Sequence, residues 1–143
     1  MDIDSTRCYT KKVPDRAGDS ARVFKTAWFS KAARKALIDD EELCKAIRQM
    51  MLGQADDLGG GVYKKRLGKN LYRSIIVAKG GRYWVYAYLF AKSKRANIGD
   101  DELVEYRELA ALYARKTDAD IAQELELEEL VEICDGYETQ IQK

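Results

Sequence analysis

The segment between residues 62 and 95 contains ten lysines and arginines but no aspartate or glutamate. Fixed cations suit a polyanion, because they pair with phosphate groups and stabilise negative charge that develops on a phosphorus centre. Lysines on exposed strands also protect sheet edges against aggregation, but solvated surfaces usually mix charges of both signs. The complete lack of acid in this segment therefore favours contact with a nucleic acid.

The spacing of these cations predicts that several of them share one surface. In an extended strand over residues 62–67, Lys64 and Arg66 point to one face and Lys65 points to the other. Arg73 lies in the next strand-like run, and three further cations directly follow the third run. If the three strands pair as a meander, these groups converge on one basic surface. Its expected members are Lys64, Arg66, Arg73, Lys92, Lys94 and Arg95.

The chain has no histidine, which excludes a Ser–His triad and a Cys–His pair as catalytic machinery. Its three cysteines, Cys8, Cys44 and Cys134, are far apart and form no CxxC pair, so we expect no zinc site. We expect no other metal or cofactor either. An odd number of scattered cysteines is typical of a reducing compartment. Because the sequence has no long apolar run and no apolar N-terminal segment, it predicts a cytoplasmic protein.

Two other motifs have simpler structural explanations. Residues 58–61 read LGGG, but they lack the spacing of a phosphate-binding P-loop and no helix follows them. They predict a turn within a flexible loop over residues 54–61. The acidic pairs at residues 56–57 and 100–101 lie in a loop and at a helix start. Helix capping explains such positions better than metal binding does.

Charge is distributed unevenly along the 143 residues. Residues 1–21 carry four basic and four acidic side chains, residues 22–116 carry 20 and 11, and residues 117–143 carry one and nine. The overall charge of +1 therefore hides a basic body of charge +9 and an acidic tail of charge −8. We expect a flexible N-terminal extension over 1–21, one domain over 22–116 and an acidic helical tail over 117–143.

Hydrophobic periodicity predicts an α+β fold. The expected strands are residues 22–26, 62–67, 71–78 and 82–90. Two helices separate the first strand from the three-stranded antiparallel meander, and Asp39 caps the second of them. A further helix spans residues 97–116, and Thr117 caps the tail helix. We expect the helices to pack on one face of the sheet. The last strand is nearly continuously apolar, which indicates a central position.

That last strand carries aromatic residues at alternate positions, namely Trp84, Tyr86, Tyr88 and Phe90. Such a row can form a platform on which nucleic-acid bases stack. More often it is core beneath helices, and we favour that interpretation.

The order of these elements and the motifs DLGGGVYKKRL and FAKSKRANI, at this separation, resemble the RelE/ParE superfamily of type II toxin–antitoxin toxins, in its RelE-like branch. The resemblance covers residues 22–116. It implies a toxin fold with an antiparallel sheet and an endoribonuclease that cuts mRNA on the ribosome without a metal. In that scheme the ribose 2′-hydroxyl attacks the adjacent phosphate and leaves a cyclic phosphate. The implied partners are mRNA on the ribosome and a cognate antitoxin that covers the basic surface.

The resemblance also assigns roles to single residues. Lys64 and Arg66 match the pair of bases that act on the 2′-hydroxyl and the phosphate, and Arg73 matches the arginine that contacts the scissile phosphate. Arg95, or Lys94, takes the place of a post-strand arginine that stabilises the leaving group or the transition state. Because lysine exchanges protons more readily than arginine, Lys64 is the expected base. The expected further RNA contacts are Lys65, Lys69, Lys92 and Lys94.

The sequence departs from RelE at one position and leaves alternatives open. RelE has a tyrosine soon after the post-strand cluster, whereas the first tyrosine here is Tyr106, inside a predicted helix. The acidic tail is expected to screen the basic surface, to extend the antitoxin interface, or to be a solvated helix. The alternative functions are a ParE-like poison of DNA gyrase and a non-catalytic RNA- or ribosome-binding protein. The paired bases favour RelE, because ParE-type proteins generally lack the full cationic set.

Overall fold

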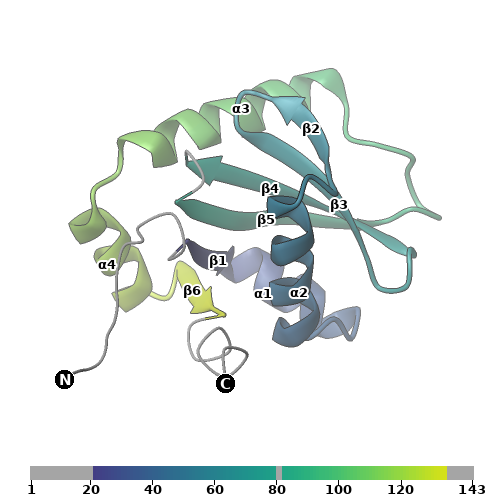
Figure 1. The fold of residues 1–143 in the computed structure, drawn as a ribbon, viewed down its shortest axis with the longest axis horizontal. Coiled ribbons are helices and arrows are strands. Elements are labelled where there is room, and N and C mark those ends of the chain that lie inside the picture. The colour runs from purple at the N-terminus through teal and green to yellow at the C-terminus, as the bar shows by residue number, and fades with distance from the viewer. Residues whose placement is uncertain (1–20, 80–81, 135–143) are drawn as a thin grey trace.

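A six-stranded sheet runs through the part of the chain that the computed structural model describes, residues 21–79 and 82–134 (Figure 1). Most of the predicted extension over residues 1–21 lies outside these residues. The strands are β1 (Arg22–Thr26), β2 (Asp56–Gly59), β3 (Val62–Leu67), β4 (Tyr72–Lys79), β5 (Tyr83–Ala91) and β6 (Leu130–Ile133). The helices are α1 (Ala27–Lys35), α2 (Asp40–Met51), α3 (Asp100–Arg115) and α4 (Asp118–Glu126).

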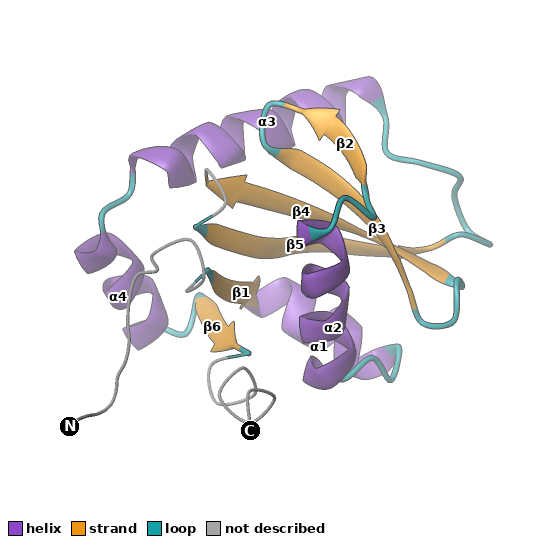
Figure 2. Cartoon of the chain, viewed as in Figure 1, coloured by secondary structure: helices purple, strands orange, loops and turns teal. Residues whose placement is uncertain are grey.

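The strands lie in the order β2-β3-β4-β5-β1-β6 (Figure 2). The meander β3-β4-β5 is antiparallel, as predicted from its period of two. β1 pairs with β5 in parallel, and β6 pairs with β1 antiparallel, so that the sheet is mostly rather than wholly antiparallel. The position of β5 between β4 and β1 confirms that this apolar strand is central.

Helices cover both faces of the sheet, which corrects the expectation that they pack on one face. Phe29 of α1 and Leu43 of α2 pack with Ile76 and Tyr86 in one core. On the other face, Tyr113 of α3 and Ile121 of α4 pack in a second core that contains Ile75, Val77 and Val85. Figure 1 shows α3 on one side of the sheet and α1 and α2 on the other. The alternation of side chains along β4 explains the two cores, because consecutive residues point to opposite faces.

A bulge in β5 divides its aromatic residues between the two cores. Ile75 pairs with Tyr88 and Ile76 pairs with Tyr86, so that Ala87 is left over between them. Trp84 and Tyr86 therefore face α1 and α2, whereas Tyr88 and Phe90 face the α3 side. Trp84, Tyr86 and Phe90 are buried, which confirms the interpretation of this row as core.

The segment predicted as a flexible loop contains a strand. Asp56–Gly59 forms β2, which pairs antiparallel with β3 at the edge of the sheet. The following turn uses glycine for its backbone conformation, since Gly61 has φ +84 and a Cβ there would lie 3.1 Å from both Ala110 and the carbonyl oxygen of Ala78. The guanidinium of Arg107 donates to the carbonyl oxygens of Leu58 and Gly59. The LGGG motif is thus a tight turn against α3.

The predicted capping residues are confirmed. The Asp39 side chain accepts a hydrogen bond from the backbone N–H of Glu42 at the start of α2, over 2.9 Å. Thr117 caps α4, where its hydroxyl and the carboxylate of Asp120 form a capping box. These local signals depend on neighbouring residues alone, which is why the sequence shows them.

The acidic tail is not one helix. α4 ends at Glu126, and the chain then forms β6, which extends the sheet beside β1. The carboxylate of Glu132 in β6 accepts two hydrogen bonds from Arg22 in β1, at 2.9 and 2.8 Å. A disulfide joins Cys134, directly after β6, to Cys44 in α2 across a sequence separation of 90 residues. This bond corrects the expectation, drawn from the odd number and wide spacing of the cysteines, that they are typical of a reducing compartment.

Within residues 21–79 and 82–134, no helix combines the length and the apolar composition that crossing a bilayer requires.

Candidate functional site

The predicted basic side chains of β3 and β4 lie on one face of the sheet. Arg66 pairs directly with Arg73 across the two strands, and Lys64 pairs with Ile75. Directly opposite residues have Cβ atoms about 4.5–5.5 Å apart, so the two arginines are close neighbours. Like charges at such positions destabilise a sheet. Positive charge is therefore concentrated at this cross-strand pair.

The neighbouring strand β5 gives this face an apolar floor. Phe90 lies opposite Arg73, and Tyr88 lies opposite Ile75. The guanidinium of Arg95, from the loop after β5, lies over both rings, 5.5 Å from the Phe90 centroid and 6.0 Å from the Tyr88 centroid. The site thus combines cations from two strands with aromatic rings from a third. α3 covers the opposite end of the same face through Ala110 and Tyr113.

Three further predicted lysines lie at the end of the sheet where β3 and β5 finish and β4 begins. Lys69 is exposed in the turn between β3 and β4, and Lys92 and Lys94 are exposed directly after β5. The backbone N–H of Lys92 donates to the carbonyl oxygen of Leu71 over 3.0 Å, which places the start of the post-strand loop beside that turn. Six predicted site residues are therefore grouped at this end, and we call them the unpaired cations. They are Lys64, Arg66, Lys69, Arg73, Lys92 and Lys94.

Among the described residues, none of the unpaired cations forms an ion pair with a carboxylate. Elsewhere in the protein, basic side chains do have acidic partners: Lys25 pairs with Asp40 at 2.7 Å, and Arg22 pairs with Glu132 at 2.8 Å. The acids of the described part of the tail also pair away from the site, since Glu124 pairs with Lys116. The tail through Cys134 therefore shows no screening of this surface.

Arg95 differs from the other predicted site residues because its guanidinium pairs with a carboxylate, whereas Arg73 donates from its Nη1 only to the backbone carbonyl oxygens of Asn70 and Tyr72, at 3.2 and 3.0 Å. Its guanidinium donates to both carboxylate oxygens of Glu102, at 2.5 and 3.2 Å, and also to the hydroxyl of Tyr88 and the carbonyl oxygen of Asn97. The hydrogen bond to Glu102 contributes most to raising the pKa of Arg95. Arg95 thus fastens the post-strand loop to α3 and β5, and it has little capacity left for a phosphate.

Lys65 is the one predicted RNA contact that the structure separates from the others. It faces the α2 side of the sheet, together with Tyr63 and Leu67, and its Nζ donates to the carbonyl oxygen of Gln54 over 2.9 Å. Burial, and then the nearby charge of Arg66, lower the pKa of Lys65. Because the side chain points away from the Arg66–Arg73 pair, it does not share a phosphate with them.

The structure adds contacts around these cations that the sequence did not predict. Asn97 accepts a hydrogen bond from Nζ of Lys64 over 3.3 Å through its Oδ1, which also accepts from the backbone N–H of Ile98. Tyr88 lies between Trp28 and Tyr106, with ring centroids 5.2 and 6.2 Å away. Burial contributes most to raising the pKa of Tyr106 to about 12, so this tyrosine stays protonated near neutral pH. Asn97 lies within the motif FAKSKRANI, and its place directly after the basic cluster is the sequence signal that could have found it.

Glu102 provides a test of the Arg95 attachment by pH. The hydrogen bond from Arg95, and then that from the backbone N–H of Gly99, lower the pKa of Glu102. A lowered pKa in the folded state stabilises the protein above the ordinary pKa of glutamate, about 4.3, and this contribution disappears as the pH falls through the lowered value. We therefore expect Glu102→Gln to have a lower Tm than the wild type at pH 7. The difference in Tm between the two proteins should become smaller as the pH falls toward 3. A Tm difference that stays constant over this range would contradict the assignment.

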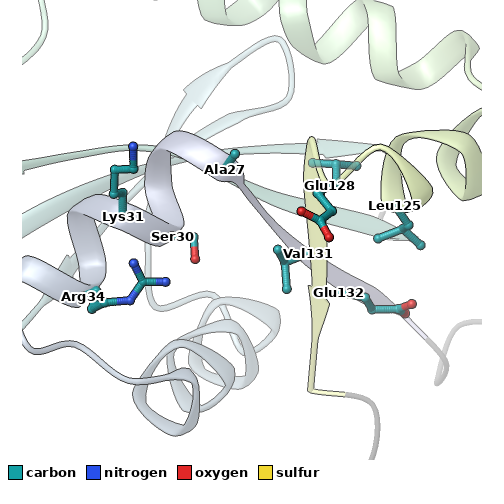
Figure 3. Close-up of a pocket in the computed structure, with 9 residues that line it drawn as sticks. Ala27, Ser30, Lys31, Arg34, Leu125, Glu128, Val131 and Glu132 are labelled. Atoms are coloured by element: carbon teal, nitrogen blue, oxygen red, sulfur yellow. The ribbon is translucent and has the colours of Figure 1, made fainter.

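A hollow of about 450 Å³ lies away from this site, between α1 and β6. Figure 3 shows Lys31 and Arg34 of α1 on one side of it and Glu128, Val131 and Glu132 on the other. We call it the mixed-charge hollow. Because cations and carboxylates face each other there, it does not have the single-signed charge that a polyanion requires.

The comparison with protein families gives one result that bears on this geometry. Residues 21–133 match the family described as the RelE toxin of the RelE/RelB toxin–antitoxin system. Neither the curated proteins nor the solved structures contain a match to the chain. The matched segment begins just before β1 and ends with β6, so it includes every described helix and strand. The chain therefore belongs to the RelE toxin family and is the toxin component of a toxin–antitoxin system.

Proposed function

We propose that this toxin inhibits translation as a ribosome-dependent endoribonuclease that cuts mRNA without a metal ion. The observation that carries the proposal is the group of unpaired cations at the end of β3, β4 and β5, next to the Tyr88 and Phe90 rings. Fixed cations without acidic partners bind a phosphate backbone. The RelE family membership favours RNA on the ribosome as the polyanion.

In the proposed reaction, the bond between the ribose 2′-oxygen and the adjacent phosphorus forms while the bond from phosphorus to the 5′-oxygen breaks. Arg66 and Arg73, paired across the strands, hold the phosphate and stabilise the charge that develops on it. Lys64, which the hydrogen bond from its Nζ to Asn97 orients, takes the proton of the 2′-hydroxyl. The leaving 5′-oxygen takes a proton from water, Lys64 returns its proton to solvent, and the products are a cyclic phosphate and a 5′-hydroxyl.

We assign Arg95 a positioning role in this reaction. It was predicted to stabilise the leaving group or the transition state, but its contacts with Glu102, Tyr88 and Asn97 occupy most of its donors. Through these contacts it holds the loop that carries Lys92, Lys94 and Asn97. Lys69, Lys92 and Lys94 bind flanking phosphates in this proposal. A RelB-type antitoxin, which toxins of this family have as their partner, would cover the same surface in the cytoplasm.

The deciding experiment is cleavage of an end-labelled mRNA by the purified toxin. Reactions contain either free mRNA or mRNA on programmed ribosomes, and the free-RNA reactions are repeated with a magnesium chelator. We expect cuts that depend on ribosomes and leave a cyclic phosphate at the new 3′ end. Growth arrest without any cut would favour the ParE-like poisoning of gyrase, and RNA binding without cuts would favour a non-catalytic ribosome-binding protein.

A further inference from the structure

A second groove lies where α1 passes the ends of β4 and β5. It has a volume of about 360 Å³. One side of it is a single face of α1, which presents Trp28, Lys31, Ala32, Lys35 and Ala36. These positions follow the three- and four-residue spacing that places side chains on one face of a helix. The other side consists of Tyr72, Leu89, Phe90 and Ala91. We call this the stacking groove.

The groove exists because β1 is shorter than β5. β1 pairs with β5 only from Tyr83 to Tyr86, and the chain then turns into α1 at Ala27. In the described part of the chain, no strand pairs with the β1 side of β5 between Tyr88 and Ala91. The small side chains Ala32 and Ala36 leave space between the helix and this strand edge.

Trp28 is the feature of the groove that most needs an explanation. Its side chain is 52% exposed, although a tryptophan usually buries most of its large apolar surface. Its ring lies 5.2 Å from that of Tyr88, at an interplanar angle of 32°, and Tyr88 in turn lies 5.8 Å from Phe90. The indole is therefore held in place by a neighbouring ring while much of its surface remains open to a ligand.

The charge of the groove has one sign. Lys31 and Lys35 are exposed on its α1 wall, and neither forms an ion pair with any described residue. Among the residues that the structure describes, no carboxylate lines the groove. The mixed-charge hollow shares Lys31 with this groove but differs in charge, because Glu128 and Glu132 also line it (Figure 3). The groove therefore suits a ligand that is negatively charged and has an aromatic or apolar part.

The groove is continuous with the site proposed for cleavage. Phe90 lines it and also lies opposite Arg73 in the sheet. Tyr72, which lines it too, packs on the α1–α2 side of the sheet, whereas the neighbouring Arg73 points to the other side, so the two sites meet only at the end of the strands. Tyr88 contacts Trp28 on the groove side and accepts a hydrogen bond from Arg95 on the site side. A chain bound across Arg66 and Arg73 would therefore reach the groove by passing the end of β5.

We propose that the stacking groove is a nucleotide subsite for single-stranded RNA, in which a base stacks on Trp28 and adjacent phosphates pair with Lys31 and Lys35. The inference rests on the proposed function, because the RNA it binds is the strand whose phosphate lies between Arg66 and Arg73. The subsite would hold a nucleotide near the cut and fix the register of the strand. Base stacking on an aromatic side chain tolerates every base, so the groove adds affinity more than sequence preference.

The test measures binding apart from cleavage. The probe is a short 2′-O-methyl RNA, which has no free 2′-hydroxyl and cannot be cut by the proposed reaction. Its binding is followed by fluorescence anisotropy of a 5′-label over a range of salt concentrations. We expect Trp28→Ala to raise Kd by about 10–100-fold, the size of one base-stacking contact, and Trp28→Phe to recover part of the loss. We expect Lys31→Gln with Lys35→Gln to reduce the salt slope by about 1.4, or about 0.7 for each lost phosphate contact.

Arg34→Gln is the matched control, because Arg34 is an exposed cation of the same helix that lines the mixed-charge hollow instead. It should leave Kd and the salt slope near wild type, and thermal unfolding of each variant checks that it is folded. If Trp28→Ala changed Kd by less than about twofold while Arg66→Ala still weakened binding, the subsite would be overturned but the proposed RNA site would not. If Trp28→Ala lost binding to the antitoxin while its RNA binding was unchanged, the subsite would also be overturned, and the groove would be assigned to the protein partner. No binding by the wild-type protein would overturn both the subsite and the proposed RNA site.

Discussion

Replacing Arg66 or Arg73 by alanine should lower the rate of mRNA cleavage on ribosomes by about 10²–10³-fold, the usual effect of losing one donor to a transition-state charge. The two guanidinium groups are opposite each other in the β3–β4 register, so each variant removes one side of the proposed phosphate clamp. Lys64→Ala should reduce the rate at least as much, because it removes the proposed base. The measurement is single-turnover cleavage of end-labelled mRNA in programmed ribosomes.

Lys65→Ala is the matched control for this series. It removes a lysine from the position between Lys64 and Arg66, but from the opposite face of β3, where Lys65 donates to Gln54. We expect its cleavage rate to remain close to wild type. Equal losses in Lys65→Ala and Lys64→Ala would show that charge alone matters, and would contradict the proposed geometry.

The Arg66→Ala variant should also fold at least as well as the wild type. Like charges directly opposite in a sheet are destabilising, so removing Arg66 relieves a repulsion of up to about 1 kcal/mol. Arg73→Ala relieves the same repulsion but loses the hydrogen bonds from its Nη1 to the carbonyl oxygens of Asn70 and Tyr72, so its Tm should change less. A variant with a higher Tm and a much lower rate is the expected combination for a site that sacrifices stability for binding. A rate loss accompanied by unfolding would instead mean that these arginines support the sheet.

Breaking the disulfide between Cys44 and Cys134 should have the largest effect on stability. It closes a loop of 90 residues and holds β6 against the α1–α2 side of the sheet. Loops of this length correspond to about 3–5 kcal/mol of stabilisation. For a domain of this size, that loss should lower Tm by roughly 10–20 °C. We expect this for Cys44→Ser with Cys134→Ser, measured by urea and thermal unfolding.

Dithiothreitol provides the internal control for the disulfide. The wild-type protein should lose about the same stability when it is reduced, whereas the double serine variant should not respond to the reductant. The slope of the unfolding free energy against urea concentration is compared between the two proteins to check that both unfold in one step. An unfolding midpoint of the wild-type protein that does not change with reductant would contradict the bond as a source of stability.

Removing the disulfide should change the cleavage rate less than it changes the stability of the fold. Cys44 and Cys134 belong to the core that faces α1 and α2, whereas Arg66 and Arg73 lie on the opposite face of the sheet. At temperatures where the double serine variant is folded, we therefore expect its cleavage rate to be close to wild type.

Much of the fold and of the site follows from short-range patterns in the sequence. The period of two over residues 62–67 places Lys64 and Arg66 on one face and Lys65 on the other, as the β3–β4 register shows. Asp39 and Thr117 cap helices because their side chains reach backbone N–H groups three residues on. Patterns of this kind are readable because the residues that cause them are neighbours in the chain.

Other features depend on residues far apart in the chain, and no local pattern encodes them. β2 and β6 are strands of four residues that form only because β3 and β1 offer an edge with which they can pair. The guanidinium of Arg95 donates to the carboxylate of Glu102, and the place of Arg95 at the end of a basic run did not suggest this partner. The bulge at Ala87 depends on how β4 pairs with β5.

The sequence by itself therefore determined the family, the order of the main elements and the face on which each strand cation lies. These properties come from motif spacing and from the two-residue period of a strand, both of which are local. The tertiary structure alone decided that Arg66 faces Arg73, that Arg95 is held by Glu102, that Cys44 bonds to Cys134 and that Trp28 borders a groove. Each of these depends on the register between segments, which the packing of the whole sheet sets.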